Sequence, residues 1–186
     1  GETIEVSTQA TCCNRYFAFR EFWVHDSEGH ECVHVESIWV TMNHETRKIV
    51  TIPERIIAPS HSEKVKMIPR LSRPKKLTEK DQLMTKQYRV RYFDIDGNGH
   101  VNNSRYFDWL LDALPMSFLT RHNLTSINIR FENEVQYHHI VTSEATLMTD
   151  IPDSIVTKHR ITMENGDVAT EAECHWEPII NHSAQA

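Results

Sequence analysis

Chemically capable side chains alternate in the segment DIDGNGHVNN, at residues 94–103. Asp96, Asn98 and His100 are each separated by one residue, and two further asparagines follow them. A carboxylate, an amide and an imidazole can together activate a water, hold a carbonyl group and move a proton near neutral pH. If the segment is extended, the three side chains share one side of it. The same spacing also matches the start of a calcium-binding loop.

The calcium interpretation fails at the twelfth position of such a loop. That position needs a bidentate glutamate to complete the oxygen ligands, but counting from Asp94 it is occupied by Arg105, a cation. The preceding residues QYRVRYF, at 87–93, show the aromatic and β-branched alternation of a strand, whereas an EF-hand loop follows a helix. We therefore expect no bound calcium here, and no metal or cofactor elsewhere.

Each polar residue of this segment also has a purely structural interpretation. A histidine such as His100 can be a core residue bonded to a backbone carbonyl, although the complete motif favours a functional role. Asn98 alone suits a turn that uses its side chain locally, and Asp96 alone suits a turn or a helix cap. Asn102 and Asn103 suit the N-cap of a helix better than a chemical role.

The residues after the motif predict a helix over 102–114, ended or kinked by Pro115. Its apolar residues fall at positions i, i+3, i+4 and i+7 and form one stripe for packing: Tyr106, Trp109, Leu110 and Ala113. Strand patterns are predicted on both sides of this helix, at 2–8, 17–25, 31–41, 86–95, 125–135, 140–149, 155–164 and 168–178. A helix covered by antiparallel strands is an α+β layer, the hotdog arrangement.

An internal repeat relates the two ends of the chain. A shift of 137 residues superimposes the pairs Gly29 and Gly166, Glu36 and Glu173, and Trp39 and Trp176. Each copy has a strand, a turn with glycine, and a strand ending in Glu-x-x-Trp, which predicts a duplicated domain. Only the second copy has a strand and helix ahead of its sheet. Since residue 1 also opens directly into a strand pattern, we expect the chain to be part of a longer protein whose first repeat begins with a strand and helix lacking here.

The predicted organisation has four parts. Residues 1–56 form the C-terminal part of a first repeat, and residues 57–85, charged and rich in proline, form a linker. Residues 86–178 form a second, complete repeat, and residues 179–186 form a tail.

Composition restricts the function classes. The formal net charge of −6 argues against a nucleic-acid partner, and apolar runs of only a few residues argue against a membrane-spanning segment. The four cysteines, Cys12, Cys13, Cys32 and Cys174, have neither the spacing of a disulfide framework nor that of a zinc site. A reducing, cytoplasmic location is therefore expected.

The sequence RYFDIDGNGHVNNSRYFDWL, at 91–110, resembles the acyl-acyl-carrier-protein (acyl-ACP) thioesterases. Their signature D-x-N-x-H-V-N-N is present without departures, from Asp96 to Asn103. The segment at 37–54 resembles the closing strand of the family's first hotdog repeat, so the two matches lie in different repeats and in the expected order. The resemblance implies two hotdog repeats, of which the first lacks its opening strand and helix. It also implies hydrolysis of fatty acyl-ACP thioesters, with acyl carrier protein as partner.

The resemblance further implies a carboxylate after the helix, within INIRFENEV at 127–135. Strand alternation alone puts Glu132 and Glu134 on one face and cannot choose between them; the family pattern assigns the function to Glu134. Plant members have a cysteine directly after this glutamate, whereas this chain has Val135. We therefore favour attack by water over a cysteine nucleophile. Whether Glu134 or Asp96 is the base stays open.

Two alternative functions come from other classes, an acyl-CoA thioesterase of the same fold and a non-catalytic scaffold that binds acyl chains. A local excess of five positive charges in residues 61–80 would steer an acidic carrier protein, but it also suits a solvated linker. Acyl chain length and the formation of a homodimer stay open at this stage.

Overall fold

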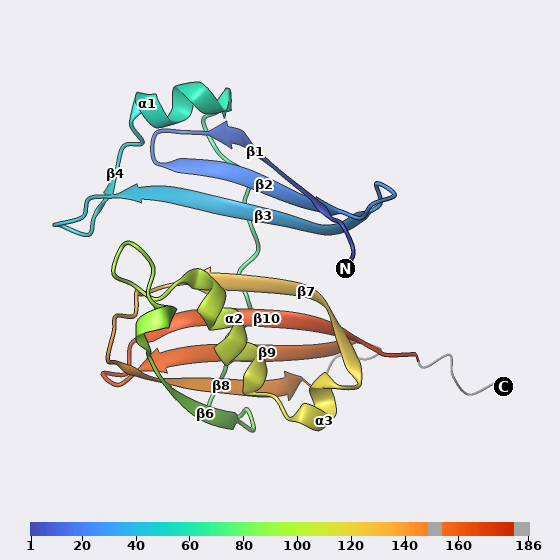
Figure 1. Cartoon of the computed structure of the whole chain (residues 1–186). Helices are drawn as coiled ribbons and strands as arrows, with labels where there is room; N and C mark the ends of the chain where they lie inside the picture. Colours follow the sequence, from blue (N-terminus) through green and yellow to red (C-terminus); the bar gives the residue numbers. More distant parts are fainter. Residues whose placement is uncertain (149–153, 181–186) are drawn as a thin grey trace. The chain divides into compact units, whose positions relative to one another are not determined.

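The computed structural model describes residues 1–148 and 154–180, and its chain divides into two compact units. The first unit comprises Gly1–Leu71 and the second begins at Ser72. Each unit contains its own five-stranded sheet (Figure 1). The division falls inside the segment expected as a linker.

The first unit is a sheet with strand order β4-β3-β2-β1-β5. Its three long strands pair antiparallel, and the short β5 pairs parallel with β1. The longest helix among residues 1–71 has four residues. The elements are β1 (Glu5–Cys13), β2 (Phe17–His25), β3 (Glu31–Met42), β4 (Ile49–Val50), α1 (Glu54–Ile57), the 3₁₀ turn η1 (Ala58–Ser60) and β5 (Glu63–Lys64).

The second unit is an antiparallel sheet with strand order β6-β8-β9-β10-β7. Helix α2 lies across one face of this sheet (Figure 1), which is the predicted hotdog arrangement of an α+β fold. The elements are β6 (Met84–Arg89), the 3₁₀ turn η2 (Tyr92–Asp94), α2 (Asn103–Asp112), α3 (Met116–Leu119), β7 (His122–Phe131), β8 (Ile140–Met148), β9 (Ile155–Met163) and β10 (Val168–Pro178).

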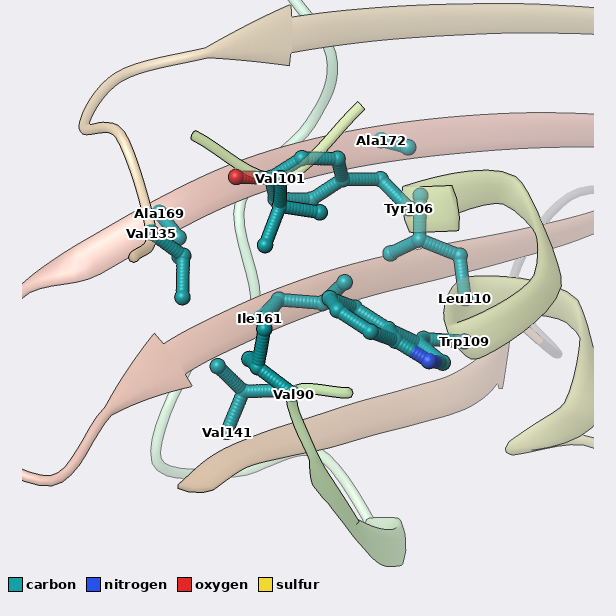
Figure 2. Packing of buried hydrophobic residues seen from close by; sticks show 10 residues of the cluster. All are labelled: Val90, Val101, Tyr106, Trp109, Leu110, Val135, Val141, Ile161, Ala169 and Ala172. Atoms are coloured by element: carbon teal, nitrogen blue, oxygen red, sulfur yellow. The ribbon is translucent and has the colours of Figure 1, made fainter. Parts of the chain in front are cut away.

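The apolar stripe of α2 forms the centre of the second unit's core. All four predicted stripe residues are buried, as the 3.6-residue period requires. Burying a large apolar side chain contributes about 1.5–3 kcal/mol, so this stripe fixes the helix on the sheet. Figure 2 shows ten residues of the main cluster: Val90, Val101, Tyr106, Trp109, Leu110, Val135, Val141, Ile161, Ala169 and Ala172.

The duplication is visible in the strand register. In the β2–β3 hairpin Trp39 pairs with Ala18, and in the β9–β10 hairpin Trp176 pairs with Ile155. Both members of the second pair follow those of the first by 137 residues. The glycine at each hairpin turn has a positive φ, near 85°, which favours glycine. The predicted equivalence of Trp39 and Trp176 is confirmed.

Two strands end earlier than the sequence pattern predicts. The strand expected over 86–95 ends at Arg89 and is followed by η2, and the strand expected over 125–135 ends at Phe131. After Phe131 the backbone N–H groups of Glu132 and Asn133 both donate to one carbonyl, that of Ala169, so the regular ladder stops. Both changes occur next to the motif at 94–103.

The helix also differs slightly from its predicted span of 102–114. It begins at Asn103, with Asn102 as N-cap accepting a 3.0 Å hydrogen bond from the Ser104 N–H. It ends at Asp112, and Pro115 precedes the short helix α3. Residue 149 of the predicted strand and residues 181–186 of the predicted tail lie outside the described residues.

The segment expected as a linker over 57–85 is largely attached to one unit or the other. Its first part contributes η1 and β5 to the first unit. Its later part runs along the second sheet, where Lys75 and Lys76 pair with glutamates of β10 and Asp81 pairs with Lys158 of β9. These ion pairs, together with the hydrogen bond from the Lys75 N–H to the Glu173 carboxylate, link the segment to the second sheet. The ion pairs also neutralise part of the segment's positive charge.

Candidate active site

The loop between η2 and α2 is organised by the Asp96 carboxylate. Its Oδ1 atom accepts a 2.8 Å hydrogen bond from the Asn98 N–H, and its Oδ2 atom lies 3.4 Å from the Asn98 side-chain amide. The Asp96 N–H donates to the His100 carbonyl at 2.8 Å, which closes the turn. Gly99 supplies the positive φ of 83° that this turn needs. The structure thus brings together Asp96, Asn98 and His100 in one turn.

The neighbouring Asp94 is buried and committed to arginines. It accepts hydrogen bonds from Arg91 Nε at 3.1 Å and Nη2 at 2.9 Å, and Arg105 Nε lies 3.5 Å away. Burial would raise the pKa of the Asp94 carboxyl, but hydrogen bonds from Arg91 and the charges of both guanidiniums hold it below its usual value. Two guanidinium groups therefore already pair with the carboxylate that would be the first ligand of a calcium loop.

Glu134 meets His100 across two paired backbone segments. The Val101 N–H donates to the Val135 carbonyl at 2.8 Å, and His100 forms a backbone bridge with Gln136. This pairing places Glu134 Oε2 3.2 Å from His100 Nε2. The His100 side chain is 17% exposed and that of Glu134 is 45% exposed, so the pair lies where the protein meets solvent.

Glu132 pairs with an arginine, whereas Glu134 pairs with His100. The Glu132 Oε1 atom pairs with Arg130 Nε at 2.8 Å. Strand periodicity alone does not separate Glu132 from Glu134, since both would share one face of a strand that continued through residue 135. The strand ends at Phe131, and the following irregular backbone directs the two glutamates to different partners.

The N-terminus of α2 offers fewer free donors than the sequence suggested. The Asn102 N–H donates to the Asp94 carbonyl, the Ser104 N–H to the Asn102 side chain, and the Arg105 N–H to the Asn102 carbonyl. Of the N–H groups from 102 to 105, that of Asn103 is the one with no hydrogen bond within residues 1–148 and 154–180. Stabilisation of an oxyanion would therefore rely on this group and on side-chain donors such as Asn98.

Tyr106 is a site neighbour that the sequence reasoning treated only as a core residue. Its pKa is raised to about 12, first by burial and further by the nearby Glu134 and Asp96 carboxylates, while a backbone hydrogen bond from Val135 opposes this. The side chain therefore lies within electrostatic range of both carboxylates. A tyrosine on an apolar helical stripe signals this arrangement only through the need of its buried hydroxyl for a partner.

The cysteines are poorly placed for nucleophilic chemistry. Cys174 is fully buried, and burial raises the pKa of its thiol to about 12, so almost no thiolate exists near neutral pH. Val135, at the position of the plant cysteine, is a fully buried core residue. The residue directly after Glu134 therefore carries no thiol.

Among residues 1–148 and 154–180, no group of three or more His, Cys, Asp or Glu side chains is arranged to hold a metal ion. No helix in the described part of the chain has the length and apolar character needed to cross a membrane.

Comparison with known sequences identifies relatives over both units. The profile of the acyl-ACP thioesterase N-terminal domain matches residues 1–60, and that of the C-terminal domain matches residues 77–178. A dodecanoyl-[acyl-carrier-protein] hydrolase from Cinnamomum camphora is 27% identical over 98% of this chain and 50% of its own length. The chain therefore spans about half the length of this curated relative.

Solved structures give the same result. A Lactobacillus plantarum protein assigned as an oleoyl thioesterase is 42% identical, with a TM-score of 0.91 over 96% of this chain and 70% of that one. The 12:0-ACP thioesterase from Umbellularia californica is 26% identical, with a TM-score of 0.82 over 96% of this chain and 67% of that one. By its two domain matches and this 42% identity, the chain belongs to the acyl-ACP thioesterase family.

Proposed function

We propose that this protein hydrolyses fatty acyl-ACP thioesters to a free fatty acid and carrier protein. The observation that supports this most directly is the 3.2 Å contact between His100 and Glu134, beside the turn that holds Asn98. A carboxylate paired with an imidazole at a partly exposed edge is suited to activating water. The membership of the family makes an acyl thioester the substrate expected at such a pair.

The reaction follows from the roles available to these side chains. Asp96 Oδ1 accepts backbone N–H groups of the turn, so Glu134 is the better placed base. Glu134 takes the proton of a water whose oxygen attacks the thioester carbonyl carbon, and the Asn98 amide and the Asn103 N–H donate to the oxyanion that forms. Collapse of this intermediate breaks the carbon–sulfur bond. The proton returns to the departing thiolate, and His100 keeps the Glu134 carboxylate in place.

The carrier protein is the preferred thiol component of the substrate. The names of two relatives, the dodecanoyl-[acyl-carrier-protein] hydrolase and the 12:0-ACP thioesterase, specify an acyl carrier protein as the thiol component. Some of the basic residues at 61–80 are already paired with carboxylates, including Lys64 with Glu54. The remaining positive charge of that segment supports, but does not by itself specify, an acidic partner. We extend the proposal to a reducing, cytoplasmic setting, which is supported by the four free thiols.

The test is a hydrolysis assay of the full-length protein with a panel of acyl-ACP substrates and the matching acyl-CoA esters. We expect turnover of acyl-ACP with a kcat/KM at least about tenfold above that of the CoA ester of the same chain length. His100→Ala is the control for contaminating activity and should reduce turnover by roughly 10²–10⁴. Faster turnover of the CoA esters would replace the proposal by an acyl-CoA thioesterase. No hydrolysis of either series would support a non-catalytic acyl-binding protein.

A further inference from the structure

We infer that Asp94 is a positioning residue, whose buried carboxylate fixes the loop that carries Asn98 and His100 relative to the first turn of α2. This role rests on the proposed function of the site and is assigned to a residue outside the reacting groups. Asp94 is 0% exposed, so it acts through the loop and does not itself contact the substrate.

The loop at 94–102 has the backbone pairing of a short hairpin. Its base is closed by the Asn102 N–H, which donates to the Asp94 carbonyl at 2.8 Å, and further backbone contacts join the two arms. Asn98 lies at the tip of this hairpin and His100 lies on the returning arm. A two-stranded hairpin has little stability of its own. The place of its tip is therefore set by the contacts that hold the two arms.

Different contacts hold the two arms. The returning arm pairs with the segment after β7, where the Val135 carbonyl accepts a 2.8 Å hydrogen bond from the Val101 N–H. His100 adds a backbone bridge with Gln136 in the same segment. The leading arm begins at Asp94, whose carboxylate binds side chains on both sides of the hairpin base. Asp94 therefore anchors the arm opposite the one that carries His100.

The Asp94 carboxylate joins η2 to the first turn of α2. It accepts hydrogen bonds from the Arg91 backbone N–H at 2.8 Å, from Arg91 Nε at 3.1 Å and from Arg91 Nη2 at 2.9 Å, so one guanidinium binds both oxygens. Arg105, in the first turn of α2, places its Nε 3.5 Å from Oδ1. A buried carboxylate is stable only where such donors surround it, and a bidentate pair accepts a narrow range of geometries. These contacts therefore define one position for the hairpin base.

The consequence for the reaction concerns groups that lie on different elements. The Asn103 N–H, a proposed donor to the oxyanion, belongs to the first turn of α2, whereas Asn98 and His100 belong to the hairpin. The two elements must keep a fixed geometry for both to act on one carbonyl group, and a misplacement of about 1 Å can cost about 10²-fold in rate. Asp94 contacts both elements and thereby fixes that geometry.

The test compares Asp94→Asn with Asp108→Asn in the full-length protein with one acyl-ACP substrate. Asp108 is the matched control, because it pairs with the same Arg105, at 3.2 Å from Nη1, but its side chain is 65% exposed and lies on α2 itself. We expect Asp94→Asn to lower kcat by about 10- to 100-fold while KM changes less than about threefold, since the substrate still binds but the reacting groups are misaligned. Asp108→Asn should keep both constants within about twofold of wild type.

Amide hydrogen exchange separates positioning from a general loss of structure. In Asp94→Asn the Asn102 amide should exchange at least about tenfold faster, because its N–H is bonded to the Asp94 carbonyl at the hairpin base. The Ala172 amide lies in β10, which is paired with strands on both sides, and should keep its wild-type rate.

A second substitution separates a lost link from an unpaired charge. Arg105→Gln added to Asp94→Asn should lower kcat by less than about a further twofold, because both changes break the same link. Recovery of the wild-type kcat in this double variant would show that the loss came from an unpaired guanidinium, and it would overturn the inference. Arg105→Gln alone leaves the Arg91 pair in place and should lower kcat about threefold, which keeps the test available if Asp94→Asn does not fold.

The outcomes that overturn this role are distinct from those that overturn the proposed function. Equal kcat in Asp94→Asn and wild type, or in Arg105→Gln and wild type, removes the positioning role. If the wild-type protein hydrolyses no thioester, the proposed function fails, and the Asn102 exchange rate still decides whether Asp94 holds the hairpin. An unchanged Asn102 exchange rate in Asp94→Asn would contradict the inference in either case.

Discussion

The β2–β3 hairpin and the β9–β10 hairpin have the same pairing register but very different surroundings. Val33, Val35 and Trp39 on β3 are 47%, 44% and 52% exposed. Their counterparts 137 residues later, Thr170, Ala172 and Trp176, are 0%, 0% and 6% exposed. In the second unit these positions belong to the sheet face that packs against the helices, and Phe118 of α3 makes an edge contact with Trp176 at 5.2 Å.

This difference separates what determines pairing from what determines burial. Strand pairing follows from the hairpin turns and the alternation of the strands, which both units have. Burial requires a covering element, and among residues 1–71 no helix exceeds four residues. The first sheet has these apolar residues because the two repeats share one strand pattern. They are exposed because no helix among residues 1–71 is long enough to cover them.

The first prediction has the largest expected effect and concerns catalysis, because all proposed site residues lie in the second unit. Glu134→Ala should lower acyl-ACP turnover by roughly 10²–10⁴, since it removes the base and the partner of His100. Steady-state kinetics of the purified full-length protein with one acyl-ACP substrate would measure the change.

Glu132→Ala is the matched control for Glu134→Ala. Glu132 is two residues away on the same segment and pairs with Arg130, so its removal should leave turnover within about twofold of wild type. A strong loss in Glu132→Ala together with a weak loss in Glu134→Ala would mean that the family pattern had been aligned to the wrong glutamate.

The second prediction tests whether register or burial determines how much a tryptophan present in both repeats contributes to stability. Trp176→Ala should destabilise the second unit by about 3–5 kcal/mol, because it opens a cavity and removes the Nε1–H donor of Thr157 Oγ1. Trp39→Ala, at the equivalent position, should cost less than about 1 kcal/mol, since half of that side chain is already in water. Urea unfolding curves of the three proteins would measure both costs, and equal costs would break the comparison.

These examples show where the sequence was sufficient. Helix α2, the repeat and most of the long strands follow from periodicities that the structure reproduces, because apolar spacing directly specifies which face is buried. The exceptions include β1, which ends five residues later than the strand expected at 2–8. The side-chain cap by Asn102 follows from the chemistry of helix ends. Local rules were enough for these features.

The site needed more than local rules. The early ends of β6 and β7 depend on partners far along the chain, such as the Ala169 carbonyl that receives both N–H groups after Phe131. The contact between Glu134 and His100 depends on backbone pairing between two loops. None of these contacts has a period that a sequence pattern could display.

The third prediction uses a position where the two hairpins differ in chemistry. Phe22 on β2 corresponds to His159 on β9, which is 1% exposed and bonded through Nε2 to Thr157 Oγ1 at 2.7 Å. Burial lowers the pKa of His159 to about 4, opposed only by a weaker interaction with the Leu110 carbonyl. The folded second unit therefore keeps this imidazole neutral where an unfolded chain would protonate it.

The direction of the pH effect follows from linkage. The unfolded histidine binds a proton below pH 6.5 but the folded one does so only near pH 4, so stability is complete above 6.5 and falls as the pH drops toward 4. The difference in pKa corresponds to about 3 kcal/mol. His159→Phe, which introduces the first unit's residue, should remove this part of the pH dependence, and the half-exposed His175→Gln should retain it. Urea unfolding at several pH values between 4 and 7.5 measures the slopes, and equal slopes for His159→Phe and wild type would contradict the assignment.

The prediction with the smallest effect concerns two ion pairs. Each links part of the segment at 57–85 to the unit to which that part belongs. Lys158 pairs with Asp81 at 2.8 Å with side chains only 9% and 18% exposed, whereas Lys64 pairs with Glu54 at 2.9 Å with side chains 65% and 68% exposed. The hydrogen bond from Lys158 is the main cause that lowers the pKa of Asp81. Asp81→Asn leaves a nearly buried ammonium without its counter-charge and should cost about 1–2 kcal/mol, while Glu54→Gln, in a fully exposed pair, should cost much less. Adding 1 M salt should reduce the Glu54 effect further and leave most of the Asp81 effect, because solvent ions screen exposed pairs more strongly. If both substitutions have the same small, salt-sensitive cost, the segment around Asp81 is held by its backbone contacts and not by this pair.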